Sequence, residues 1–295
     1  MLPLSFSLPP RARLGTSFLL ALALSSCTEN KTPDIPAPTP NPVSTAPNAE
    51  VRDFAQYTEL MWSDEFNGAG PADATKWAYD TGNNNGWGNQ ELETYTTSTD
   101  NVSQNGGNLV IQAMRQAGST GYTSGRILTK GKQSFQYGRI DVRAKLPQGQ
   151  GIWPAIWMLG SDIDQNNWPK CGEIDIMELR GQEPTKILST MHYGTTTADH
   201  QYKGIDNVKL PGNASYAADF HVYSIVRAKD QMQFFVDGAK YYTFTSSDAS
   251  PYPFNNPFFM VLNVAVGGNF LGNPDASTVF PQQMQVDYVR YYQYK

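Results

Sequence analysis

Hydrophobic and polar residues alternate along most of the chain after residue 54, and this period of two predicts β-strands. In the stretch 139–146 the two classes alternate at every position, as in a strand with one buried face. Residues 109–113 form a second candidate strand, and residues 286–292 are rich in β-branched and aromatic side chains that favour strands. An almost continuous apolar run at 258–266 indicates a central strand covered on both faces.

Turn residues separate these runs. Residues 232–236 lead through Asp237 and Gly238 into 240–242, which predicts a β-hairpin. Many short strands separated by Gly, Asn, Asp and Pro indicate a sandwich or a barrel. A β/α-barrel of this length would need about eight amphipathic helices, and the sequence has no such series and no internal repeat. We therefore predict one all-β domain over residues 54–295.

The N-terminus differs from the rest of the chain. Residues 1–26 place two arginines before a short apolar stretch, which predicts an export signal. Small residues before Cys27 resemble the processing box of bacterial lipoproteins, so we expect a lipid anchor on Cys27, with an ordinary secretory signal as the alternative. Residues 27–53 contain six prolines and predict an extended linker. We expect the protein to be exported. With a lipid anchor it would lie at the cell surface or in the periplasm, and without one it would be secreted. We expect no membrane contact other than the anchor.

Composition excludes several classes of function. The 295 residues have a net charge of −5, and the lack of a basic excess argues against a nucleic-acid partner. Three His and two Cys are too few for a zinc or iron–sulfur framework. Cys171 has no partner except Cys27, so we expect it to be a buried free thiol and not a nucleophile.

Three acidic residues, Glu173, Asp175 and Glu178, lie within six positions and are interleaved with apolar residues. On a regular strand Glu178 faces away from the other two, but a one-residue bulge near Ile176 or Met177 would return it to their face. A row of like charges raises the pKa of each carboxyl, which is unfavourable in a structural role. A retaining glycosidase needs such a pair, with carboxyls about 5–5.5 Å apart. The alternative is a solvated strand face.

On the glycosidase hypothesis Glu173 is the nucleophile and Glu178 is the general acid and later the base. Asp175, between them, would help to decide which group keeps the proton. Upstream, Trp153 and Trp157 fall on one face of a predicted strand and would form a platform for sugar rings. The alternative for these two tryptophans is a place in the core.

Taken in order, several stretches resemble glycoside hydrolase family 16, and most closely its bacterial laminarinase-type endo-1,3-β-glucanases. The resemblance covers residues 60–295 and is shown by these stretches: 62–68, 86–92, 122–127, 137–140, 149–155, 168–178 and 262–269. It implies a β-jelly-roll sandwich of two curved antiparallel sheets with a concave cleft. It also implies retaining hydrolysis by Glu173, Asp175 and Glu178. The six-residue motif from Glu173 to Glu178, with the extra Met177, resembles the bulged form found in laminarinases, agarases and carrageenases. Lichenases have a form that is one residue shorter.

The resemblance extends to binding residues. It implies that six residues contact the substrate: Asn89, Arg126, Trp153, Trp157, Trp168 and His192. A lone His is more often structural, which is the alternative for His192. Many members bind a structural calcium, for which the matching positions are Glu65, Gly107 and Asp287; oxygen ligands suit this cation, and an ordinary turn without metal is the alternative. No cofactor is needed for the chemistry.

We expect a monomeric enzyme that cleaves internal β-1,3 bonds in laminarin-like β-glucans. Alternatives in the same class act on mixed-linkage glucan, agar, porphyran or carrageenan, although sulfated substrates would favour a more basic cleft. A non-catalytic glucan-binding protein on this fold would usually lose the catalytic acids, and a structural sandwich leaves them unexplained. The family often has Trp where this chain has Phe234 and Phe270, and Glu-Trp where this chain has Val226 and Arg227. The resemblance therefore does not determine which sugars the outer subsites prefer.

Overall fold

The computed structural model describes residues 48–295. The predicted export signal, Cys27 and most of the predicted linker lie outside the described residues, so these predictions and the domain boundary at residue 54 stay predictions. Within residues 48–295 the regular structure consists of β-strands and short 3-10 helices, without an α-helix. In this part of the chain no helix has the length and apolar character needed to cross a bilayer.

The first sheet has ten strands: β1 (Glu59–Asp64), β3 (Glu93–Tyr95), β4 (Val102–Asn105), β5 (Asn108–Arg115), β6 (Tyr122–Ser124), β8 (Gly138–Lys145), β13 (His221–Ala228), β14 (Gln231–Val236), β15 (Ala239–Thr245) and β17 (Gln282–Gln293). Their order is β15-β14-β13-β8-β17-β5-β6-β3, with β1 paired to β17 and β4 paired to β5. All pairs are antiparallel except β3 with β6.

The second sheet has seven strands: β2 (Ala78–Tyr79), β7 (Arg126–Leu128), β9 (Ile152–Gly160), β10 (Glu173–Glu178), β11 (Ile187–Tyr193), β12 (Gln201–Val208) and β16 (Phe258–Val266). Their order is β12-β11-β10-β9-β16-β7-β2, and every pair is antiparallel. The 3-10 helices are η1 (Phe54–Gln56), η2 (Asn84–Gly86), η3 (Pro211–Asn213) and η4 (Pro253–Asn255).

The strands that alternation predicted are present. Residues 139–146 and 109–113 correspond to β8 and β5, and β17 contains 286–292. Strand β16 is buried at all nine positions and lies between β9 and β7, as expected for a central strand. The predicted hairpin joins β14 to β15 through Asp237 (φ 50°) and Gly238 (φ 77°), and two positive φ values suit a type I′ turn.

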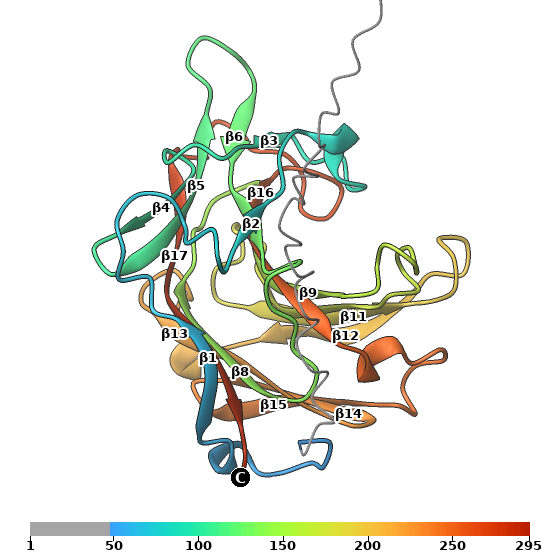
Figure 1. Ribbon diagram of the computed structural model, residues 1–295. Helices are drawn as coiled ribbons and strands as arrows, with labels where there is room; N and C mark the ends of the chain where they lie inside the picture. The colour runs from blue at the N-terminus through green and yellow to red at the C-terminus, as the bar shows by residue number, and fades with distance from the viewer. Residues whose placement is uncertain (1–47) are drawn as a thin grey trace, which may run out of the picture. The chain divides into compact units, whose positions relative to one another are not determined.

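The two sheets lie one over the other, with a single large hydrophobic core between them (Figure 1). Strand β9 shows how the sequence builds this arrangement, because Ile152, Ile156 and Met158 enter the core while Trp153 and Trp157 face the opposite side. Each large apolar side chain that is fully buried contributes about 1.5–3 kcal/mol. The outer face of the second sheet is thereby left free for other chemistry.

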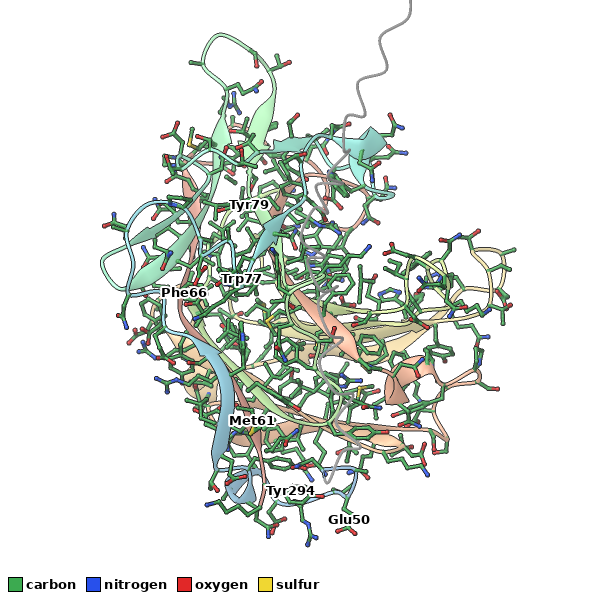
Figure 2. The ribbon with its side chains drawn as sticks, in the orientation of Figure 1. Glu50, Met61, Phe66, Trp77, Tyr79 and Tyr294 are labelled. Carbon is green, nitrogen blue, oxygen red and sulfur yellow. The ribbon has the colours of Figure 1, made fainter. Side chains whose placement is uncertain are left out.

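Trp77 fixes the segment that leads into β2. Its indole N–H donates to Asp64 Oδ2 at 2.8 Å, and its ring lies 6.0 Å from that of Phe66 (Figure 2). Tyr79, in β2 itself, pairs with Ile127 in β7. These contacts support β7 from its outer side, and β7 begins with Arg126, one of the predicted site residues.

Candidate active site

Strand β10 contains the bulge that the spacing of the acids predicted. Against β9, Asp175 pairs with Trp157 but Met177 pairs with Ile156, so β10 has one extra residue at this point. The pairing with β11 shifts over the same interval. The side chains of Ile176 and Met177 both enter the hydrophobic core, which resets the alternation of the strand.

As a result, Glu173, Asp175 and Glu178 line one cavity of about 830 Å³ on the outer face of the second sheet. All six residues that the family resemblance proposed as substrate contacts line the same cavity: Asn89 from the loop before β3, Arg126 from β7, Trp153 and Trp157 from β9, Trp168 from the loop after β9, and His192 from β11. The structure thus brings the predicted residues together, while their roles toward a sugar stay predictions.

Glu178 is held by an aromatic wall. The indole N–H of Trp153 donates to Glu178 Oε1 at 3.0 Å, so the carboxyl has a fixed orientation. The ring of Trp153 lies 4.6 Å from that of Phe270 at an interplanar angle of 33°, and the guanidinium of Arg180 lies 4.2 Å from the Phe270 ring. Neighbouring aromatic rings of this kind offer an apolar surface to the faces of sugars.

His192 lies beside the other two acids. Its Nε2 is 3.3 Å from Asp175 Oδ2 and 3.8 Å from Glu173 Oε1, and its Nδ1 is 2.9 Å from Nε2 of His200. Burial lowers the pKa of His192, but the contact with Asp175 and the surrounding negative charges outweigh it and raise the pKa to about 9. The ring is therefore a cation at neutral pH, which donates from Nδ1 to His200 and forms an ion pair with Asp175 through Nε2.

Burial raises the pKa of both candidate catalytic glutamates. At Glu173 burial and the charge of Asp175 raise the pKa to about 7, against the opposing charges of His192 and Arg126. At Glu178 burial and the charge of Asp175 raise the pKa well above its ordinary value. The raised pKa favours a protonated Glu178, whereas the charges of His192 and Arg126 favour an ionised Glu173. That is the division that a nucleophile and a general acid require.

Arg126 brings a further positive charge to the cavity, besides those of Arg180 and His192. Its Nε is 2.9 Å from Asp80 Oδ2, and its guanidinium lies 4.5 Å from the Trp87 ring and 4.7 Å from the Trp157 ring. Flat contact between guanidinium and aromatic faces stabilises both partners. Arg126 therefore fixes two indoles of the cavity wall while it favours the ionised form of Glu173.

Several residues of the cavity were not found from the sequence. Tyr202 and His200 line it, and Tyr202 pairs directly with His192 across β11 and β12. Only the register of these strands reveals this, because no motif marks either residue. Glu91 also lines the cavity, and Glu93 is fully buried behind it. The sequence signal for this pair is two acids separated by one leucine, with Tyr95 two residues after Glu93.

The positions matched to calcium have other partners in this structure. Glu65 accepts two hydrogen bonds from Arg290, at 3.0 and 2.7 Å, and Asp287 accepts one from Arg143 at 2.6 Å. Gly107 lies in the turn between β4 and β5. Calcium at this place stays a prediction.

A cluster of three metal-ligand types within residues 48–295 is formed by Glu173, Asp175 and His192, whose ligand atoms lie within 4.8 Å of one another. A metal ion at this place would have to displace the proton of His192, whose pKa is raised to about 9. The same three residues suit acid–base chemistry without a metal. Cys171 is a buried free cysteine, as expected, and burial raises its pKa to about 12, which excludes it as a nucleophile.

Comparison with known proteins agrees with this geometry. Residues 89–290 match the family described as "Glycosyl hydrolases family 16". The chain is 45% identical over 258 residues to glucan endo-1,3-beta-glucosidase A1 of Niallia circulans, a match that covers 79% of this chain but only 37% of that protein. It is 41% identical to a beta-glucanase of Rhodothermus marinus, covering 82% of this chain and 87% of that one.

The fold agrees as well. The laminarinase catalytic domain of Thermotoga maritima MSB8 superimposes with a TM-score of 0.74 at 40% identity, covering 80% of this chain and 98% of that domain. The sequence match over most of the chain and the shared fold agree, and the protein belongs to glycoside hydrolase family 16.

Proposed function

We propose that the protein is a retaining endo-hydrolase of β-1,3-glucosidic bonds in laminarin-like β-glucans. The central observation is that Glu173, Asp175 and Glu178 line one cavity whose walls contain tryptophans. The activities named for the Niallia and Thermotoga relatives support the β-1,3-glucan as substrate. Mixed-linkage glucan, agar and carrageenan, the alternatives that the sequence left open, remain rival substrates for the same cavity.

In the first step the carboxylate of Glu173 attacks the anomeric carbon and forms a covalent glycosyl ester. The glycosidic C–O bond breaks at the same time, and the proton of Glu178 passes to the leaving oxygen. Asp175 and His192 form an oppositely charged pair next to Glu173. Because the cation lowers the pKa of Glu173, it favours the ionised form that acts as nucleophile.

In the second step Glu178 acts as a base. The negative charge of Glu173 is one of the factors that raise the pKa of Glu178. This charge disappears when Glu173 becomes an ester, so the pKa of Glu178 falls in the intermediate. Glu178 then accepts a proton from water, the water oxygen bonds to the anomeric carbon, and the ester bond to Glu173 breaks.

The direct test measures new reducing ends after incubation with laminarin, curdlan, lichenan, agarose and carrageenan, with sizing of the products. We expect internal cleavage of laminarin, and loss of activity in Glu173→Gln and Glu178→Gln with the fold retained. Glu50→Gln, at an exposed acid outside the cavity, is the matched control and should keep full activity. Full activity in both cleft variants would overturn the proposal. Cleavage of agarose or carrageenan alone would assign another substrate, and binding of laminarin without cleavage would indicate a glucan-binding protein.

We also propose that the protein is exported and anchored by a lipid on Cys27, because residues 1–26 have the features of a signal and small residues precede the cysteine. Radiolabelled palmitate should be incorporated into the full-length protein in its native host and not into Cys27→Ser. Equal labelling of both proteins, or labelling of neither, would contradict the anchor.

A further inference from the structure

The loop between β2 and β3 presents Trp87 and Asn89 to the cavity in an unfavourable backbone conformation. Positive φ values occur at Asn84 (44°), Asn85 (53°), Trp87 (51°) and Gln90 (58°). A residue other than glycine in this left-handed region costs roughly 1 kcal/mol or more. Such a conformation persists only when contacts with the rest of the protein determine it.

Some of these contacts come from the end of β16. The N–H of Leu92 donates to Val266 O at 2.8 Å, and the N–H of Asn269 donates to Asn89 O at 2.7 Å. Gly268 (φ 95°) allows this close approach, because a Cβ at that position would lie 2.8 Å from Asn89 O. The backbone of the loop is thus tied to residues 266–269.

The side chains of the loop are tied through Glu91. Its Oε1 accepts a hydrogen bond from Asn89 Nδ2 at 3.1 Å, and its Oε2 accepts one from the Tyr95 hydroxyl at 3.4 Å. Tyr95 in turn accepts from Asn263 Nδ2 at 3.0 Å, and Asn263 Oδ1 accepts from the Trp157 indole at 2.7 Å. One connected network therefore joins Glu91 to two residues of the cavity wall, Asn89 and Trp157.

Behind this network lies Glu93, with 0% of its surface exposed. Its Oε2 accepts a hydrogen bond from the Val266 N–H at 2.7 Å. Its Oε1 is buried and receives no hydrogen bond from any donor of residues 48–295. A buried carboxylate oxygen without a donor is costly, whereas a protonated oxygen needs an acceptor instead. The side chain of Glu91, which interacts with that of Glu93, can act as this acceptor.

The electrostatic surroundings agree with a proton at this place. Burial, the charge of Glu91 and a side-chain hydrogen bond with Glu91 all raise the pKa of Glu93 well above its ordinary value. The other ionisable groups nearby are Tyr95 on the same strand, Arg126 on β7 and Tyr122, which pairs with Glu93 on β6. Strand β16 contributes only uncharged residues. No cation that contacts Glu93 directly is present among these groups to stabilise a second negative charge.

We propose that Glu93 is a positioning residue that holds a proton and donates it from Oε1 to the carboxylate of Glu91. The pair shares one negative charge, and it fixes the loop that presents Asn89 to the substrate. Through Tyr95 and Asn263 it also fixes Trp157. The part of this inference that concerns sugar binding rests on the proposed function, whereas the part that concerns the shared proton does not.

The proton makes the stability of the protein depend on pH. In the unfolded chain Glu93 titrates near about 4.3, and in the folded protein it titrates at a higher pH. Between these two values the folded state binds the extra proton, so the contribution of Glu93 to stability falls as pH rises. Above the folded value both carboxyls are charged, and their repulsion loosens the loop.

The first test compares thermal unfolding of the wild-type protein and Glu93→Gln from about pH 4 to about pH 10. The side-chain amide of this variant donates to Glu91, accepts from the Val266 N–H and never ionises. We expect the melting temperature of E93Q to equal that of the wild type at the acid end and to exceed it increasingly as pH rises. Glu93→Ala, which makes neither hydrogen bond, should be destabilised throughout. A constant difference between E93Q and wild type across the range would overturn the shared proton.

The second test measures binding of a laminari-oligosaccharide by calorimetry in the Glu178→Gln background, where the general acid no longer titrates. Titration of Glu173 and His192 affects both proteins alike. We expect the affinity of E178Q to fall about tenfold more toward alkaline pH than that of E93Q/E178Q, the size of one or two hydrogen bonds to the sugar. The same alkaline loss in both proteins would contradict positioning by Glu93. If neither binds the oligosaccharide at any pH, the proposed substrate is wrong, and the unfolding test still decides on the proton.

Discussion

Glu173 and Glu178 lie on the same strand but differ in their neighbours, and we expect this difference to separate their roles. Glu178 touches the indole N–H of Trp153, whereas Glu173 lies near the imidazolium of His192. A cation favours the charged carboxylate more strongly than a neutral donor does. We therefore expect a bell-shaped pH dependence, in which activity requires ionised Glu173 and protonated Glu178.

Trp153→Phe tests the alkaline side of this profile. The hydrogen bond from Trp153 lowers the pKa of Glu178 against the larger effect of burial. Its loss should raise that pKa, so the alkaline limb of kcat/KM moves to higher pH. Trp157→Phe is the matched control, because its indole donates to Asn263 and to no carboxyl. An alkaline limb that stays in place in W153F would contradict the assignment of Glu178 as the acid.

His192→Gln tests the acid side. Burial and the charge of Asp175 raise the pKa of Glu173 to about 7, and the charge of His192 opposes this rise. Without the cation the pKa of Glu173 rises further, so a higher pH is needed to ionise it and the acid limb moves upward. His221→Gln removes a histidine that pairs with Asp237 away from the cavity and should leave the limb unchanged. A downward shift in H192Q would refute the electrostatic role of His192.

At the scale of secondary-structure elements, β10 shows why an irregular strand suits this site. The bulge places both Ile176 and Met177 in the core and returns Glu178 to the cavity. Neighbouring strands β9 and β11 follow the shift in register without interruption of the sheet. A regular strand of the same sequence would bury a carboxyl in the core, which costs several kcal/mol.

Deletion of Met177 tests this explanation, because it changes whether the number of residues between Glu173 and Glu178 is odd or even. The deletion removes the bulge but leaves an odd number of residues between Glu173 and Glu178, so both carboxyls remain on one face of a regular strand. We expect a less stable protein with measurable hydrolysis. Deletion of both Ile176 and Met177 would turn the acid toward the core and should abolish activity. Activity in the double deletion, measured as new reducing ends alongside circular dichroism, would contradict the role of the bulge.

At the scale of the whole domain, Arg227 connects the two sheets. It lies in β13 of the first sheet, and its guanidinium is 4.6 Å from the ring of Phe258 in the second. It donates hydrogen bonds of 2.8 Å to the carbonyls of Phe135, Phe254 and Asn256. In the sequence this arginine is only a departure from the family pattern, and in the structure it joins the two sheets and does not line the cavity.

Arg227→Met should therefore lower the free energy of unfolding by about 3 kcal/mol or more, since buried carbonyls lose their donors. Activity at low temperature should persist, because the cavity is not touched. Arg52→Met, which breaks an exposed ion pair with Glu50, should change stability by less than about 1 kcal/mol. Urea unfolding of the two variants measures the difference, and equal stabilities would contradict the role of Arg227.

The sequence was sufficient for those features that depend on local pattern. Alternation predicted β8, a continuous apolar run predicted β16, and the parity of three acids predicted the bulge in β10. Contacts between distant positions could not be predicted in this way. The hydrogen bond between Asn263 and Tyr95 joins residues 168 positions apart, and Tyr202 reaches the cavity only through its register with His192. Such pairs are determined by the packing of whole strands, which a local pattern does not contain.

The central claim is that Glu173 is the nucleophile and Glu178 the acid and base. The most direct test offers azide and an activated β-glucoside to Glu173→Gly and Glu178→Ala, and determines the anomeric configuration of the glycosyl azide by NMR. Azide should replace the missing nucleophile in E173G and give the α-azide. In E178A it should attack the covalent intermediate and give the β-azide. The opposite pair of configurations would contradict the assignment of the two roles.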